Sequence, residues 1–152
     1  MKKLIILLLL IILTAGLTGC KKSVLYSENE IAIEFGTECG WCAGEKFIVV
    51  SPAKIKYERT IPCGDDQGTE TKSISITTEK WDSIWSSFNY NLFKTLDYNA
   101  CYVCADGCDE IIRITKAGNT HEIRYTPGED IEGIEDLRHL LAEILSDFNE
   151  QD

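Results

Sequence analysis

Alternation of apolar and polar residues predicts β-strands in the first half of the chain. Residues 30–35 and 54–61 carry an apolar side chain at most second positions, which is typical of a strand with one buried face. Residues 47–50 form a short β-branched run that a Ser-Pro pair ends, so we expect this run to form a hairpin with residues 54–61. Residues 62–72 form a predicted polar loop, and residues 73–77 a further short strand.

Spacings of three and four residues predict two amphipathic helices. Between residues 81 and 88 the apolar residues fall at i, i+3, i+4 and i+7, and Thr77 or Thr78 is expected to cap this helix. The last helix is predicted over residues 134–148, where the apolar positions are Ile134, Leu137, Leu140, Leu141, Ile144, Leu145 and Phe148. Each helix therefore has one face to bury.

A second hairpin is predicted between the two helices, with strands at residues 111–116 and 120–125. The order is therefore strands, helix, strands, helix. We expect a single α+β domain over residues 30–149, with an antiparallel β-sheet and both amphipathic helices on one face.

The first twenty residues predict export. Two lysines precede an unbroken run of ten apolar residues, which is shorter than the ~20 residues of a membrane-spanning helix. The tetrad Leu-Thr-Gly-Cys that ends at Cys20 resembles the lipobox of bacterial lipoproteins. That resemblance implies cleavage before Cys20, a lipid on its sulfur and acylation, for example with palmitate, of the new amino terminus. An ordinary secretory signal or a short anchor helix is the alternative.

The lipobox reading divides the chain into three parts. Residues 1–19 are the expected signal peptide, residues 20–29 the lipidated cysteine and its tether, and residues 30–149 the domain. The protein is then expected in the bacterial cell envelope, held to a membrane by lipid on Cys20, with its domain outside the cytoplasm. More than one acyl chain makes such anchoring stable.

The charge of the chain excludes one class of partner. Without residues 1–19, the remaining 133 residues carry 13 basic and 25 acidic side chains, a formal charge near −12. Nucleic-acid binding needs a surface of Lys and Arg for phosphate contacts, so it is not expected. An acidic surface also disfavours contact with anionic lipid headgroups, and it is compatible with a basic partner.

Cysteine usage predicts a disulfide framework. Apart from Cys20 the chain has an even set of six cysteines, and in an exported protein such a set forms disulfides. These are Cys39, Cys42, Cys63, Cys101, Cys104 and Cys108. The sequence does not choose among the 15 ways of pairing six cysteines. The repeated C-x-x-C spacing suggests that the two cysteine loops lie side by side and are cross-linked.

Two other chemistries are considered for the cysteines. Cys39-Gly-Trp-Cys42 has the spacing of a thioredoxin-type redox pair, but a Gly and a β-branched run follow it where that motif needs a helix. The four cysteines of the two C-x-x-C pairs have the composition of a tetrathiolate zinc site. Export into an oxidising compartment disfavours it, so neither a metal nor another cofactor is expected.

No catalytic residue is assigned from the sequence, and the protein is not expected to be an enzyme. The chain has no Walker, GxSxG or HExxH pattern, and neither histidine stands beside a cysteine or serine in a nucleophile motif. Trp41 is the exception among the tryptophans, because it lies in a loop between two cysteines rather than on a helix. We expect Trp41 to contact a partner protein or to cover the core.

The order of hairpins and helices is similar to emfourin, a small inhibitor of thermolysin-like metalloproteases. The segments that carry the similarity are WDSIWSSF (81–88), DEIIRITKAGNTHEIRY (109–125) and IEDLRHLLAEIL (134–145). The chain also resembles small Cys-rich envelope lipoproteins that place a cysteine pair before a first hairpin. These resemblances imply a protein-interaction or protease-inhibitor domain, and they transfer no functional residue. A thiol, redox or metal-handling envelope protein is the alternative.

Overall fold

A computed structural model describes residues 31–150. The predicted signal peptide, Cys20 and the tether lie outside the described residues. The strands are β1 (Ile31–Cys39), β2 (Gly44–Val50), β3 (Lys54–Ile61), β4 (Gly68–Ser75), β5 (Cys108–Lys116) and β6 (Asn119–Tyr125). The helices are α2 (Thr78–Ser86), α3 (Tyr90–Phe93), the 3₁₀-helix η1 (Tyr102–Ala105) and α4 (Glu135–Asn149).

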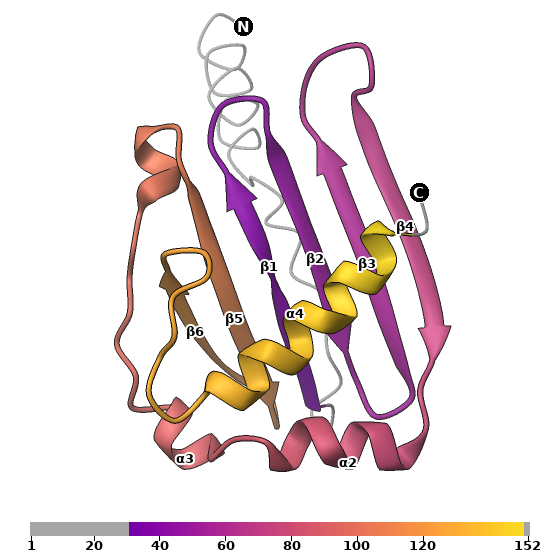
Figure 1. Ribbon diagram of the computed structural model, residues 1–152, viewed down its shortest axis with the longest axis vertical. Helices are drawn as coiled ribbons and strands as arrows, with labels where there is room; N and C mark the ends of the chain where they lie inside the picture. The colour runs from indigo at the N-terminus through magenta and orange to yellow at the C-terminus, as the bar shows by residue number, and fades with distance from the viewer. Residues whose placement is uncertain (1–30, 151–152) are drawn as a thin grey trace, which may run out of the picture.

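The six strands form one antiparallel sheet in the order β4-β3-β2-β1-β5-β6. Strand β1 is central and pairs with β2 on one side and with β5 on the other. Figure 1 shows α4 crossing one face of the sheet diagonally, while α2 and α3 lie across the lower end. The α+β class with an antiparallel sheet is therefore confirmed.

The hydrophobic core lies between the sheet and α4. Every second residue of the strands points to this side, and the alternation places Ile33, Phe35, Ile48, Val50, Ile55, Tyr57, Ile112, Ile114, Ile123 and Tyr125 in the core. Helix α4 adds Leu137, Leu141, Ile144, Leu145 and Phe148, and α2 adds Trp81 and Ile84. Phe148 stacks on Tyr57 with ring centroids 5.3 Å apart, which fixes the C-terminal end of α4 on β3.

Several predicted elements agree with the structure. Strand β3 has the predicted bounds, and Thr77 caps α2 by accepting a hydrogen bond from the amide of Lys80 at 3.3 Å. The second hairpin turns at Ala117 and Gly118, both at positive φ. Within residues 31–150 no helix is both long and apolar enough to cross a membrane.

Two expectations for the first half of the chain were wrong. The polar stretch 62–72 is not all loop, because β4 begins at Gly68 and pairs with β3 along its whole length. This strand is at the sheet edge with most of its side chains in solvent, so it lacks apolar alternation. Strand β1 also runs to Cys39 rather than ending at Phe35, which places the first cysteine in the sheet.

Candidate functional site

The six described cysteines gather at the end of the sheet opposite α2 and α3, which we call the cysteine end. Their sulfurs lie at disulfide distance in three pairs. These pairs are Cys39–Cys108, Cys42–Cys63 and Cys101–Cys104, with Cα atoms 4.0, 5.4 and 5.3 Å apart. The expectation that these residues form a disulfide framework is consistent with this arrangement.

The Cys39–Cys108 pair joins the two cysteine loops. Cys39 is the last residue of β1 and Cys108 the first of β5, and the two face each other directly in the β1–β5 register. Just beyond them the Gly40 amide donates to the Gly107 carbonyl at 2.8 Å. A Cβ on Gly40 would lie 2.7 Å from the Val103 carbonyl oxygen, so this close approach requires glycine. The two loops therefore lie side by side, as their spacing suggested.

The tetrad at residues 39–42 is not a C-x-x-C disulfide. Cys39 bonds across to Cys108, while Cys42 bonds to Cys63 at the end of the neighbouring β3–β4 hairpin. Strand β2 begins at Gly44, so no helix follows the tetrad. A thioredoxin-type redox pair of Cys39 and Cys42, which the spacing of the two cysteines allowed, is therefore absent from this part of the described chain. The pair that closes a C-x-x-C ring is Cys101–Cys104.

Trp41 is the most exposed large hydrophobic residue of the described chain. Its relative exposure is 83%, and its backbone φ is 55°, in the left-handed region. The flanking cysteines are fixed by two different disulfides, one to β5 and one to the β3–β4 hairpin. Trp41 is thus not a cover over the core, which was one of the two expectations for it. It stands outward on a braced turn.

The Cys101–Cys104 pair lies on a second braced loop, around η1. The segment before it runs along β6, where the Arg124 amide donates to the Tyr98 carbonyl and the Ala100 amide donates to the Arg124 carbonyl, both at 2.9 Å. After η1, the Gly107 amide donates to the Tyr102 carbonyl at 2.8 Å. Both cysteines are exposed, and Tyr102 between them is 51% exposed.

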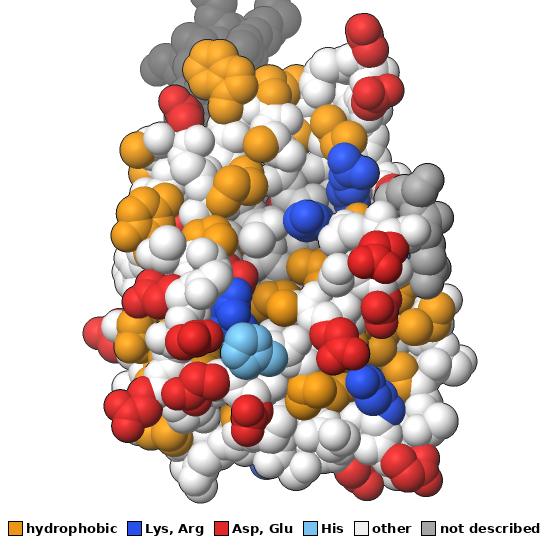
Figure 2. All heavy atoms as spheres, in the orientation of Figure 1, with side chains coloured by type: hydrophobic (Ala, Val, Ile, Leu, Met, Phe, Trp, Pro, Cys, Tyr) orange, Lys and Arg blue, Asp and Glu red, His pale blue; other side chains and the backbone are white. Residues whose placement is uncertain are grey.

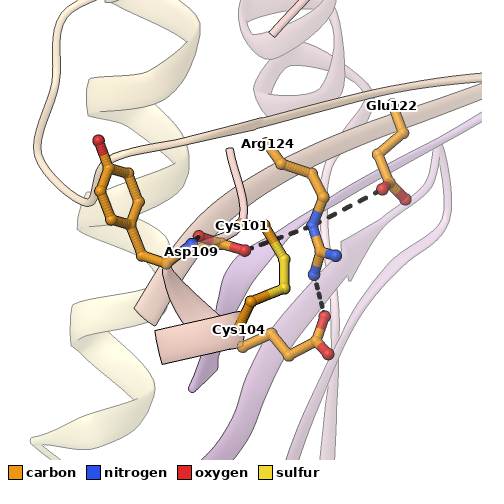
Figure 3. The surroundings of a disulfide bond; sticks show 7 residues. Cys101, Cys104, Asp109, Glu122 and Arg124 are labelled. Carbon is orange, nitrogen blue, oxygen red and sulfur yellow. Dashed lines mark hydrogen bonds and ion pairs between the residues drawn. A yellow bond between two sulfur atoms is a disulfide. The ribbon is translucent and has the colours of Figure 1, made fainter. Parts of the chain in front are cut away.

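A charged cluster lies beneath this loop. Asp109 is fully buried, and its Oδ1 accepts a hydrogen bond from the Tyr102 amide at 2.7 Å. The Arg124 Nε lies 3.8 Å from Asp109 Oδ2 and 3.9 Å from Glu122 Oε1, and Arg124 also pairs with Glu38. Figure 3 shows Asp109 and Arg124 beside the Cys101–Cys104 disulfide. Charge and backbone together hold the loop over the end of β5.

The Glu45 carboxyl, at the same end of the sheet, has a raised pKa. Desolvation raises the pKa of Glu45 above its ordinary value of 4.5, and the carboxylates of Glu38, Glu58 and Glu34 raise it further. Glu38 is the direct cross-strand neighbour of Glu45. Like charges at paired positions repel, so the two carboxylates destabilise the folded protein at neutral pH.

The described residues offer no metal site, since no group of three or more His, Cys, Asp or Glu among them could hold an ion. His121 is half-buried, and its Nε2 lies 2.9 Å from the Leu96 carbonyl oxygen with its ring against Phe93. His139 is exposed on α4 near Asp130. Neither histidine lies at the cysteine end.

Sequence reasoning missed Asp109 and Arg124. Asp109 precedes the predicted strand 111–116, and Arg124 is an ordinary polar position of the predicted strand 120–125; only the pairing of β5 with β1 and β6 brings them under the C-x-x-C loop. The one signal available was Asp109 following Cys108 directly. No family model matches this chain, and no curated protein matches it.

Proposed function

We propose that the protein is a cell-envelope lipoprotein whose α+β domain binds a partner protein through the cysteine end without catalysis. The two amphipathic helices α2 and α4 serve in this proposal as scaffold on one face of the sheet. The observation that carries the proposal is the 83% exposure of Trp41 on a turn fixed by two disulfides. The membrane is the second partner, through lipid on Cys20.

A fixed and exposed tryptophan is well suited to binding. Tryptophan is among the residues that contribute most to binding energy at interfaces. The disulfides on both sides hold the turn before the partner arrives, so little conformational entropy remains to be lost on binding. Figure 2 shows hydrophobic side chains at this end of the molecule, over the β1–β2 turn and η1, and acidic side chains both at its upper right and over the lower part of the same face.

The inhibitor form of the proposal can be tested directly. A fragment that starts after Cys20 is assayed against a panel of secreted thermolysin-like metalloproteases, alongside the Trp41→Ala variant. Micromolar inhibition that Trp41→Ala weakens at least tenfold supports it. Inhibition by neither protein overturns the inhibitor form and leaves the wider binding proposal to the next experiment.

Partner binding itself is tested by photo-crosslinking in the producing bacterium. A benzoylphenylalanine at position 41 is expected to give one discrete cross-linked product. The matched control places the same group at Leu92, which is 41% exposed and lies in α3 at the opposite end of the sheet. Products that are absent at both positions, or equally abundant at both, contradict binding through the cysteine end.

Lipidation is tested separately. Cells are labelled with an alkyne-bearing palmitate, and the protein is expected to take up the label and to partition with membranes. Cys20→Ser should abolish both. Unchanged labelling of that variant would overturn the lipoprotein assignment without affecting the binding proposal.

A further inference from the structure

We propose that Cys101–Cys104 is an exchange-active disulfide that oxidises a protein dithiol, while the other two disulfides are structural. This inference adds a stoichiometric thiol exchange, in which the disulfide is consumed once, to the partner binding proposed above, and it does not rest on that binding. It stands on three observations: exposure of the two sulfur-bearing residues, independent support of their loop, and, beside them, a buried carboxylate oxygen that has an ion pair with Arg124 but no hydrogen bond.

Accessibility distinguishes this pair, because it is the described pair in which both cysteines are exposed. Cys39 and Cys108 are both half-buried inside paired strands, and in the third pair Cys42 is exposed but Cys63, just after β3, is half-buried. An attacking thiolate must approach a sulfur directly, so access decides which disulfide exchanges first. The ring is also the smallest of the three, with a sequence separation of 3, so opening it releases little chain.

The loop does not depend on this disulfide for its position. The backbone bonds to Arg124 hold it on one side, and the bond between Gly40 and Gly107 holds it on the other. Asp109 adds a third attachment through the Tyr102 amide at 2.7 Å. Opening the Cys101–Cys104 bond therefore leaves the loop in place, which a reversible site needs.

The charges beneath the loop suit the reduced form. Asp109 Oδ2 and Arg124 Nε are both buried and make no hydrogen bond within residues 31–150. A buried acceptor without a donor is unfavourable, and a cysteine thiol beside it would supply the missing hydrogen. A guanidinium near a cysteine stabilises its thiolate, and therefore makes it a better leaving group. Figure 3 shows both groups next to the disulfide.

The proposed step conserves atoms and electrons. A thiolate of the partner dithiol attacks one sulfur of the Cys101–Cys104 bond, which breaks and leaves the other cysteine as a thiolate that takes up a proton. The second partner thiol loses its proton and attacks the partner's sulfur in the mixed disulfide. The bond from that sulfur to the protein cysteine breaks, and this cysteine leaves as a thiolate that takes up a proton. The partner is oxidised to a disulfide by two electrons, and Cys101 and Cys104 are reduced to two thiols.

The test is a reduction series with dithiothreitol on the oxidised fragment that starts after Cys20, quenched by alkylation and mapped by peptide mass. We expect Cys101 and Cys104 to become alkylated at a dithiothreitol concentration at least tenfold below that required by the other four cysteines. Circular dichroism should stay native at that point. Simultaneous reduction of all three pairs, or loss of native dichroism when this pair opens, overturns the proposal.

Variants make the test specific. Cys101→Ala/Cys104→Ala should lose oxidation of a fluorescent dithiol peptide, whereas Cys42→Ala/Cys63→Ala, which removes another bond of the same end, should retain it. Arg124→Gln should slow reduction about threefold, and Arg124→Lys, which keeps the charge, should restore the rate. Peptide oxidation that survives loss of Cys101 and Cys104 contradicts the assignment. Cross-linking at position 41 is a separate readout, so failure of one proposal is distinguishable from failure of the other.

Discussion

At the residue scale, Asp109 links the sheet to the loop that carries the C-x-x-C ring. It is fully buried, and a single oxygen accepts from the Tyr102 amide. A backbone amide that loses its only acceptor inside a protein carries the full cost of desolvation. Asp109 is therefore the side-chain attachment of this loop, beside the backbone bonds to Arg124 and between Gly40 and Gly107.

Asp109→Ala should lower the free energy of unfolding by about 1–3 kcal/mol, because the Tyr102 amide is left without an acceptor. Asp109→Asn keeps an acceptor oxygen at the same position and should retain most of the stability. Urea denaturation of both variants measures the difference. Equal stability of the alanine variant and the wild type would show that the bond contributes nothing.

Glu45 gives a pH-dependent prediction. Its pKa is raised in the folded state by burial and by Glu38, so stability is lost as pH rises from 4.5 through the raised value. Glu45→Gln removes this penalty and should melt at a higher temperature than the wild type at pH 7. The gap should close below pH 4.5, where the carboxyl is protonated in both states.

The control for Glu45 is Glu132→Gln, which makes the same change in net charge at another exposed position, in the loop before α4. It should shift the melting temperature at pH 7 less than Glu45→Gln does. Melting curves at pH 7 and pH 4 for both variants suffice. A larger stabilisation by Glu132→Gln would assign the effect to overall charge rather than to the local cluster.

At the scale of elements, an ion pair anchors α4 to the sheet. Arg138 of α4 donates through Nε to Glu110 Oε1 of β5 at 2.7 Å, and both side chains are largely buried. Removing one member of a buried pair leaves an uncompensated charge in the core. The helix is therefore held by charge as well as by its apolar stripe.

Arg138→Met should lower the free energy of unfolding by about 3–5 kcal/mol. Adding Glu110→Leu should recover much of this loss, because no buried charge then remains unpaired. A double-mutant cycle in urea measures both effects. A loss of under about 1 kcal/mol for the single variant would instead match an exposed salt bridge.

How far the sequence predicts each element depends on where it lies. Helix α4 is visible in the sequence because most of its apolar residues face the core, and β3 alternates because only one of its faces is buried. Strand β4 leaves no apolar pattern in the sequence, because an edge strand pairs through its backbone while its side chains face solvent. Arg138 gives no signal either, since a basic residue in a helix reads as exposed until its partner Glu110 is known.

For the candidate site, the sequence predicted the residues that take part but not how they are arranged. The six cysteines and Trp41 stand out as residue types in an exported chain. Their pairing follows from strand order, because Cys39 meets Cys108 only when β5 inserts beside β1. Long-range pairing of this kind leaves no local pattern, so the sequence predicted a disulfide framework but neither the pairing of its cysteines nor the burial of Asp109 beneath them.

At the scale of the whole molecule, the three disulfides differ in the length of chain that they close. In the chain-entropy account, a separation of 69 residues gives about 4 kcal/mol and one of 3 residues about 2 kcal/mol. Cys39–Cys108 is therefore the main covalent contribution to stability.

Cys39→Ala/Cys108→Ala should lower the melting temperature more than Cys101→Ala/Cys104→Ala does. The ordering follows from loop length and is independent of any exchange activity. Calorimetry on the two double variants gives the comparison under one set of conditions. A larger drop in melting temperature from removing Cys101–Cys104 would mean that this disulfide stabilises the cysteine end by more than the loop-closure entropy accounts for.

The Cys39–Cys108 bond also has a mechanical consequence. The described chain begins with β1 at Ile31 and ends with α4, so a pull on the two ends loads β1 and α4 first. The bond spans 69 positions and carries tension directly from β1 to β5, bypassing every residue between them. If Cys20 fixes the protein to a membrane, a force on the domain cannot extend Trp41 or the C-x-x-C loop until that one covalent link breaks.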